Sequence, residues 1–396
     1  MNAEKAKQPI VRSNTLVRIA AAICMVVVLV GMGMWLNRPV EGEVATSTSK
    51  LVFVPAKVVK VVSDNAVPDW ENGDGRRAGT QELLVDILQG EHQGEVLSLS
   101  NYMSALFNVD VQVGDRVIVR IITNDDGSYY PTMFNYDRGI QLIPLVAVFV
   151  ILLLVLGGKK GVGALFGLLF TLVCVWWILI PGLIQGLPAM PLTIFIVSVT
   201  ATASLVALNG WSCKTFCAAL GCMAGVVAAG VAAALVGAAM PMDGFNMTEA
   251  EDLILYGADK GLDIHGLLVC GVLIASLGAV MDVALSLASA MWEIHLINPD
   301  MKPRQLVQSG MQVGKDAMGT MANTLILAFA GASLNLLILI QTYDIPFLQL
   351  INTDFLCIEI IQSMAGSIGI LLTVPLVAAI SAQIMTRKGG STQVNI

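Results

Sequence analysis

Long apolar runs constrain the fold of this chain more than any other feature of its sequence. Each run is about 17 residues or longer, the length a helix needs to cross the hydrocarbon core of a bilayer. They occupy residues 19–36, 140–156, 161–183, 188–209, 215–240, 264–292, 319–341 and 355–380. Of the 396 residues, 56% are hydrophobic and only 13% are charged. The sequence therefore predicts an α-helical polytopic membrane protein with eight transmembrane helices.

Lysine and arginine residues beside these runs predict the orientation of the chain in the membrane. Twelve of them would flank the runs on the inner side, and only Lys260 would lie in a short outer loop. Both termini are thus expected in the cytoplasm, as an N-terminus of residues 1–18 and a tail of residues 386–396. The run at 19–36 lacks a small-x-small cleavage pattern, so we expect a retained signal-anchor helix. Residues 140–385 would form a seven-helix membrane domain.

Between the first two runs, residues 37–139 have the composition of a small extracytoplasmic β domain. Five β-branched or alternating segments are separated by turn signals. They are residues 51–62, 81–88, 94–100, 116–122 and 128–134. This pattern fits an OB-like fold or a small barrel. Fifteen acidic against nine basic residues, without an aromatic platform, argue against nucleic acid as a partner. A cap or a docking domain for an envelope protein remains the simpler interpretation.

An acidic residue interrupts one apolar run near its middle. Asp282 lies in LGAVMDVALSLASAMWE, residues 277–293. On a helix, five residues of this segment share one face: Gly278, Asp282, Ser286, Ser289 and Glu293. A carboxylate at mid-membrane is unfavourable by roughly 2.5 to 3.5 kcal/mol, so it should face protein or water and not lipid.

The next two predicted spans also carry polar residues along one side. In the run at 319–341 these are Thr320, Thr324, Gly331 and Asn335, with Asn323 beside them. In the run at 355–380 they are Glu359, Gln362, Ser363, Gly366 and Thr373. Hydrogen bonds between membrane helices are usually worth only about 0.6 kcal/mol, so packing alone seldom requires so many polar groups. We therefore expect a polar face shared by the last three spans.

These residues suggest the chemistry of ion transfer. A carboxylate in an apolar setting can exchange a proton for a cation, which is the basis of coupled transport. Asp282 is the expected centre, and the neutral oxygen donors around it are Ser286, Ser289, Thr320, Asn323 and Thr324. Glu359 and Glu293 would bracket the path at its outer and inner ends. Lys315 and Asp316 would lie at the inner end as a gate or as interfacial anchors. The alternative is a structural Asp282 that is hydrogen-bonded by a neighbour such as Asn323.

Other functional classes lack their signatures. The sequence has no GxSxG, HExxH, Walker or paired GxGD motif, so no catalytic residue and no enzyme activity is predicted. The cysteines lie mostly among apolar residues without a CxxC pair, and neither a metal site nor a cofactor is expected.

The acidic loop at 242–263 predicts a short interfacial helix near Thr248. Gly163-x-x-x-Gly167 and Gly221-x-x-x-Gly225 predict close helix packing.

Two long segments resemble a known family. GAVMDVALSLASAM from Gly278 and SGMQVGKDAMGTMANTLILAFAG from Ser309 are similar to the YibE/F-like family of bacterial multi-pass membrane proteins. The resemblance spans the anchor, the β module and the seven later runs, and it implies the inner membrane of a bacterial cell. The family is usually described only as membrane or transport-related. Its motif residues carried by this sequence are Asp282, Ser286, Ser289, Gly310, Gly314, Asp316, Gly319, Thr320, Asn323 and Thr324. Lys315 stands where the family has Arg as often as Lys.

The leading functional hypothesis is a transporter or permease of a small cation or a proton-coupled solute, with the polar face around Asp282 as its path. The rival is a non-transporting scaffold, in which the polar residues fix helix packing and the outer domain docks an envelope protein. Beyond the lipid bilayer, the expected partners are a small cation or proton and an envelope protein. The sequence leaves the oligomeric state open, a homo-oligomer included.

Overall fold

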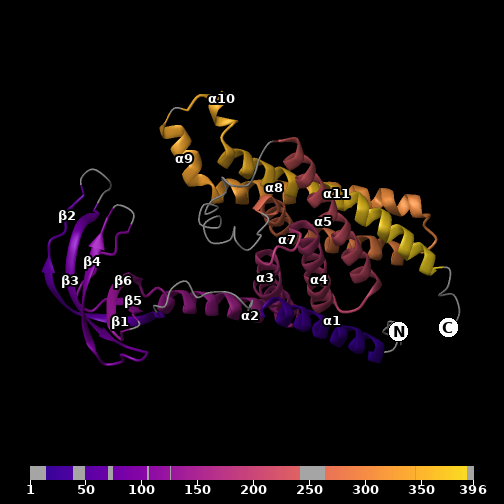
Figure 1. The fold of residues 1–396 in the computed structure, drawn as a ribbon. Helices are drawn as coiled ribbons and strands as arrows, with labels where there is room; N and C mark the ends of the chain where they lie inside the picture. Colours follow the sequence, from indigo (N-terminus) through magenta and orange to yellow (C-terminus); the bar gives the residue numbers. More distant parts are fainter. Residues whose placement is uncertain are drawn as a thin grey trace, which may run out of the picture. The chain divides into compact units, whose positions relative to one another are not determined.

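The computed structural model describes residues 15–38, 50–69, 75–104, 107–124, 126–240, 264–343 and 345–389. The chain divides into two compact units (Figure 1). One comprises Pro39–Leu152 and holds the β strands, and the other comprises Met1–Arg38 with Leu153–Ile396 and holds most of the helices. The predictions for the outermost ends of the chain and for the loop at 242–263 lie outside the described residues.

The β unit is an antiparallel sheet that curls into a half-barrel. Its strands are β1 (Lys50–Asp64), β2 (Val67–Pro68), β3 (Arg77–Ile87), β4 (Val96–Met103), β5 (Arg116–Thr123) and β6 (Tyr129–Tyr136). The sheet order is β2-β3-β1-β5-β6, and β4 pairs with β3. The long strand β1 pairs with β5 along its first half and with β3 along its second, where two register shifts bend it. A sheet was expected from the five segments; β2 was not, because two residues carry no alternation.

Alternating side chains of this sheet fill one apolar core. The fully buried residues include Ala56, Val58, Leu83, Val85, Val117 and Val119, which alternate along β1, β3 and β5. Their neighbours along each strand point outward, as the period of two in a strand requires. The alternation that predicts the strands thus also predicts which side of the sheet is buried.

A polar network lies beside this core and is fully hydrogen-bonded. Gln81 and Asn101 are 1% and 2% exposed. Arg77 donates to Asp64 Oδ1 at 2.6 Å and to Asp110 Oδ1 at 3.0 Å. Gln81 Nε2 donates to both carboxylates at 3.2 Å, and Asn101 Nδ2 donates to Gln81 Oε1 at 3.1 Å. The hydrogen bond from Arg77 is the main cause that lowers the pKa of Asp64 from 3.8 to about 2.

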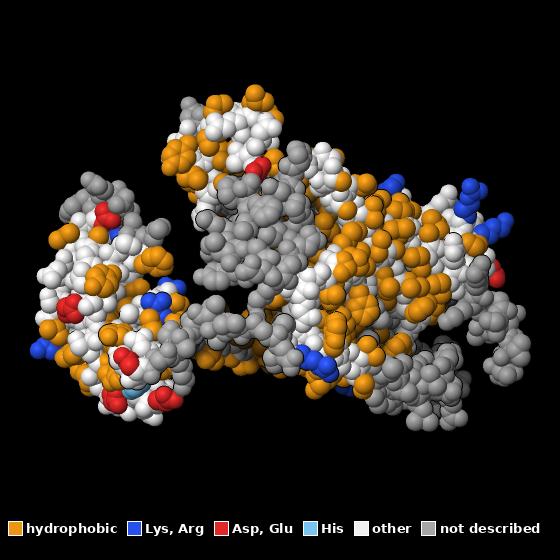
Figure 2. Space-filling model, in the orientation of Figure 1, with side chains coloured by type: hydrophobic (Ala, Val, Ile, Leu, Met, Phe, Trp, Pro, Cys, Tyr) orange, Lys and Arg blue, Asp and Glu red, His pale blue; other side chains and the backbone are white. Residues whose placement is uncertain are grey.

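Helices make up the rest of the described chain. They are α1 (Thr15–Leu36), α2 (Gly139–Cys174), the π-helical turn η1 (Val175–Leu179), α3 (Ile180–Ile184), α4 (Ala189–Asn209), α5 (Cys213–Ala239), α7 (Ile264–Ile297), α8 (Pro303–Ala332), α9 (Leu334–Thr342), α10 (Phe347–Leu350) and α11 (Asp354–Gly389). Within the described residues, five helices are long and apolar enough to cross a membrane, or six if the bent pair α8 and α9 forms one span. Figure 2 shows hydrophobic side chains spread over the outer surface of the helices. A multi-pass membrane protein is the architecture that fits this surface.

Helices α5, α7 and α11 form the centre of the helical unit, and glycines let them approach closely. A methyl group on Gly225 would overlap the hydroxyl of Thr373 on α11 and lie 3.1 Å from Val280 on α7. Gly163 and Gly167 similarly face Ala207 and Ser204 on α4. The close packing predicted from both glycine pairs is confirmed, because only a residue without Cβ leaves this room.

The predicted spans 140–156 and 161–183 lie in one helical stretch, Gly139–Ile184, of 46 residues. The backbone is not helical at Gly158, where φ is 52° and ψ is −129°. A Cβ on Gly161 would overlap the carbonyl oxygen of Leu153, although residues this far apart in a straight helix are about 12 Å apart. The chain therefore bends sharply at Gly158, a conformation that glycine adopts without strain.

The predicted span 319–341 is also interrupted. α8 ends at Ala332 and α9 begins at Leu334, and their axes differ by 61°. No residue of α9 is buried. The apolar composition of this run predicts membrane contact but does not predict the bend, because Leu and Ile are compatible with a straight helix and with a bent one.

Candidate functional site

The candidate site lies on α7, which is surrounded by other helices on most of its circumference. α7 contacts α4, α5, α8 and α11. Its buried side is apolar and includes Leu273, Val280, Ala284, Leu287 and Met291, each less than 3% exposed. This side anchors the helix by close packing with α5 and α11. Residues on the opposite side are therefore held in fixed positions by a rigid element.

The polar residues of α7 lie on that opposite side. Gly278, Asp282, Ser286 and Glu293 are exposed, and Ser289 is half-buried. No atom of the described residues lies within 4 Å of where a Cβ on Gly278 would be, so no described side chain fills the space there, one turn before Asp282. The stripe that sequence spacing assigns to one face of a helix is thus an open face of the helical unit.

Asp282 interacts electrostatically with the buried Cys222 of α5 but has no hydrogen-bonding partner within the described part of the protein. Its carboxylate makes no hydrogen bond and no ion pair there. The hydrogen bond to Asn323 that would make Asp282 a structural group does not form. In a 32-residue apolar helix, an exposed carboxylate needs water, a cation, a proton or another protein surface to be stable.

The polar residues of α8 are exposed as well. Thr320 Oγ1 donates to the carbonyl oxygen of Ala317 at 3.1 Å, and Thr324 Oγ1 donates to that of Thr320 at 2.8 Å. These bonds use the hydroxyl protons and leave the oxygen lone pairs to accept. The Asn323 side chain is exposed and makes no hydrogen bond within the described residues. The core side of α8 consists of Leu306, Gly310, Gly314 and Leu325.

The two gate candidates on α8 and Glu293 on α7 are all exposed. Lys315 and Asp316 are adjacent in the chain, yet neither forms an ion pair in the described structure, nor does Glu293. The main-chain oxygen of Asp316 accepts a hydrogen bond from Thr320 at 3.4 Å. The two helices pack closely beside these charges, because a Cβ on Gly310 of α8 would lie 2.6 Å from the sulfur of Met291 on α7.

On α11 the polar residues are buried instead. Ser363 and Thr373 are 6% and 0% exposed and donate to carbonyl oxygens of their own helix. Gln362 lies beside Gly271 of α7, with Nε2 3.3 Å from where a Cβ would be. Glu359 is half-buried, and its Oε2 is enclosed without a hydrogen-bond partner among the described residues. The predicted residues therefore form two sets, one mostly exposed on α7 and α8 and one buried or half-buried on α11.

Two buried polar residues near the C-terminal ends of α7 and α11 were not predicted as part of the site. His295 Nδ1 and Ser381 Oγ are enclosed without a hydrogen-bond partner among the described residues. Helical spacing could have found His295, because it lies one turn after the buried Met291 and two turns after the buried Leu287 and Ala288. The imidazole packs near Trp292, with ring centroids 6.5 Å apart.

The β unit presents an exposed apolar patch on the outer side of β1, β5 and β6. We define this outer-face patch as Leu51, Phe53, Tyr130 and Phe134, all about half exposed. The strand register aligns Leu51 with Ile122 and Ile122 with Tyr130. Phe53 and Phe134 meet edge to face at 4.9 Å. Exposed aromatic clusters of this kind are common in protein interfaces.

Comparisons with known proteins identify both units of the chain. Residues 145–387 match the family model described as YibE/F-like protein, and residues 55–135 match the model described as YibE/F family N-terminal domain. The boundary between the two matches falls at the junction of β6 and α2. No curated protein and no solved structure matches the chain.

Proposed function

This chain belongs to the YibE/F-like family, and we propose that it is a membrane transporter or permease of a small cation or a proton-coupled solute. One observation carries the proposal. Asp282 lies in the middle of an apolar helix, on an open face, with no hydrogen-bond or ion-pair partner among the described residues. A structural carboxylate would be expected to have such partners, whereas one that binds a proton or a cation must keep its oxygens available.

The proposed path follows the polar sides of α7 and α8. Asp282 carries the exchangeable charge, and Ser286, Thr320, Asn323 and Thr324 supply neutral oxygens when the cation moves along the helices. A cation would be shared among oxygen ligands from two helices, as hard cations prefer. Glu293, Lys315 and Asp316 act at the inner end, and Glu359 acts from α11 at the outer end. Water must reach this face, because lipid would not solvate the carboxylate.

We propose eight spans for the membrane topology, with both termini in the cytoplasm and the β unit outside the inner membrane. A straight helix of the length of Gly139–Ile184 would measure about 69 Å, more than twice the hydrocarbon thickness. The break at Gly158 is followed by Lys159 and Lys160, which suit a turn at the cytoplasmic surface. The eight spans would then be the anchor α1, two spans in this stretch, α4, α5, α7, one broken span of α8 and α9, and α11.

Transport is tested with purified protein in vesicles that contain a pH-sensitive dye. Wild-type protein should carry protons, alone or in exchange for an added monovalent or divalent cation, and Asp282→Asn should abolish the flux. Asp86→Asn is the matched control, because the same change in the β unit removes a carboxylate outside the membrane. The proposal fails if wild-type vesicles move neither protons nor any cation tested, or if Asp282→Asn retains full flux.

The second candidate is a scaffold without transport activity, and the outer-face patch favours it. Four half-exposed apolar side chains on a rigid sheet could dock an envelope protein. A photoreactive amino acid at position 130 in living cells should then crosslink one defined partner. Phe53→Glu should remove that crosslink, whereas Lys57→Glu, a change on the same strand, should not. Full function of Asp282→Asn in cells together with this crosslink would favour the scaffold over the transporter.

A further inference from the structure

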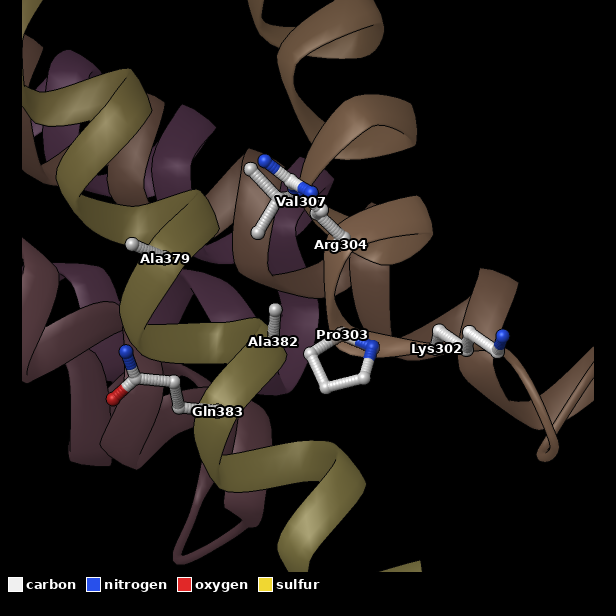
Figure 3. Close-up of a pocket in the computed structure, with 7 residues that line it drawn as sticks. All are labelled: Lys302, Pro303, Arg304, Val307, Ala379, Ala382 and Gln383. Carbon is white, nitrogen blue, oxygen red and sulfur yellow. The ribbon is translucent and has the colours of Figure 1, made fainter.

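A groove opens between the start of α8 and the inner part of α11 (Figure 3). Its volume is about 470 Å³. Seven residues line it: Lys302, Pro303, Arg304, Val307, Ala379, Ala382 and Gln383. The α11 residues belong to the apolar stretch Leu356–Thr386, and Gln383 lies within its last turn. The groove is therefore at the end of a span, where hydrocarbon meets headgroups.

The floor and walls of the groove are apolar. Val307, Ala379 and Ala382 present only methyl groups, and the ring of Pro303 points toward Ala382 in Figure 3. The two alanines leave room that larger side chains would fill. An apolar floor does not hold a small hydrophilic anion, since it provides no hydrogen bond to replace those from water. It does accommodate a hydrocarbon chain.

The rim of the groove is cationic. Lys302 and Arg304 are exposed, and neither forms an ion pair in the described part of the chain. They flank the first residue of a 30-residue helix, so the partial positive charge of the helix N-terminus adds to theirs. Figure 3 shows Arg304 beside Val307 and Lys302 extending outward from the wall of α8. A flexible lysine stem lets the ammonium group reach a bound headgroup.

We propose that this groove is a binding site for an anionic phospholipid. Arg304 binds the phosphate at the rim, the Lys302 side chain turns toward it from the outward position drawn in Figure 3, and an acyl chain lies along Val307, Ala379 and Ala382. Basic pockets between membrane helices bind such headgroups, and the combination of an apolar floor with a cationic rim requires an amphipathic ligand. The site goes beyond the proposed transport and does not depend on it, because it requires only that α8 and α11 cross the bilayer.

Native mass spectrometry of the full-length protein tests this site. The protein is titrated with phosphatidylglycerol, with phosphatidylcholine and with inorganic phosphate. Wild-type protein should retain phosphatidylglycerol in preference to phosphatidylcholine. The double variant Lys302→Gln/Arg304→Gln should weaken phosphatidylglycerol binding roughly thirtyfold, since each basic residue near the membrane surface contributes roughly fivefold. The matched control is Lys57→Gln/Lys60→Gln, which removes two exposed charges from β1 in the β unit and should leave binding unchanged.

Two further variants separate the contributions of the rim and the floor. Lys302→Arg/Arg304→Lys keeps both charges and should retain the lipid, which excludes misfolding as the cause of a loss. Ala382→Leu fills the floor and should weaken phosphatidylglycerol binding severalfold. Equal binding of phosphatidylcholine, unchanged binding by the Gln double variant, or a floor variant without effect would overturn the proposal. Inorganic phosphate that displaces the lipid at equal concentration would assign the rim to a soluble anion instead.

Discussion

The polar groups of the β unit and those of the helical unit are stabilised in opposite ways. In the β unit, Gln81 and Asn101 are buried, and hydrogen bonds connect them with Arg77, Asp64 and Asp110. In the helical unit, Asp282 has no such partner in the described structure, and the Oε2 of Glu359 and the Nδ1 of His295 are enclosed without one. Buried hydroxyl groups of the helical unit, such as that of Thr373, donate to carbonyl oxygens of their own helix, but these three groups lack such compensation among the described residues.

This difference separates structural polar groups from candidates for function. A buried polar group without a partner costs roughly 1 to 3 kcal/mol, so a fold retains it only if something else is gained. The network around Gln81 holds β1 against β3. Asp282 and His295 on α7 and Glu359 on α11 receive no comparable stabilisation within the described protein. Their stabilisation is expected from a ligand, water or another copy of the chain.

The largest effect is expected from Gln81→Ala. This change leaves Asn101 and two carboxylates without their shared partner, and the β unit should lose about 3 kcal/mol of stability. Pulse proteolysis of the full-length protein in urea measures the loss. Gln112→Ala, at an exposed glutamine, is the control and should change the midpoint little. A loss equal to that of the control would mean that the network contributes nothing to stability.

A gain of stability is expected from Asp282→Leu. Replacing an unpartnered carboxylate in an apolar span should stabilise the helical unit by about 2 kcal/mol while it abolishes transport. Unfolding by SDS titration measures the stability. Asp316→Leu, just before the apolar run of α8, should give a smaller gain because the unfavourable energy falls with distance from the bilayer centre. Destabilisation by Asp282→Leu would reverse the comparison and show that Asp282 has a structural partner.

A smaller gain is expected from Glu359→Met. The enclosed Oε2 of Glu359 has no hydrogen bond within the described residues, and removing it should stabilise the protein by about 1 kcal/mol in the same SDS titration. Glu82→Met provides the contrast, because Glu82 accepts a hydrogen bond from Ser100 at 2.7 Å. That change should not stabilise the β unit. Equal gains from both would mean that unpartnered and partnered carboxylates do not differ.

The smallest effect concerns the acid stability of the β unit. The folded pKa of Asp64 is lowered from 3.8 to about 2, so the ionised form is favoured in the folded state. Its contribution is therefore complete above about pH 4 and is lost as the pH falls toward 2. Asp64→Asn should lower stability by less than about 1 kcal/mol at pH 7, since the ion pair is partly exposed, and by only a small part of that at pH 2, where the folded carboxyl group is about half protonated. Hydrogen exchange of β1 and β3 at each pH measures the difference.

Much of the fold follows from periodicity in the sequence. In β5, the alternation of Val117 and Val119 with Arg116 and Arg120 defines both a strand and its buried side. Apolar runs likewise predict the helices α4, α5, α7 and α11. The bends at Gly158 and after Ala332 could not be predicted, because a run of apolar residues suits a straight helix, a hairpin and a broken span equally well.

The site was predictable only as a set of residues on each helix. The spacing places Gly278, Asp282 and Ser286 on one face of α7, but it does not predict whether that face contacts another helix, lipid or water. In a soluble protein the apolar side points inward and fixes the direction. In a membrane protein the core and the lipid are both apolar, so the direction of a polar stripe is set by packing partners such as Gly225 and Thr373, which lie far away in the sequence.

Only two residues separate strand β6 from helix α2, and an ion pair and two hydrogen bonds connect them to the strand β5 and to the start of α2. Asp137 forms an ion pair with Arg116 at 3.5 Å, its main-chain nitrogen donates to the Arg116 oxygen, and its side chain accepts from the nitrogen of Gly139. The sheet and the first turns of α2 accordingly belong to one compact unit. A force applied to the sheet would therefore reach the first turns of α2 directly, through the main chain and the ion pair between Asp137 and Arg116.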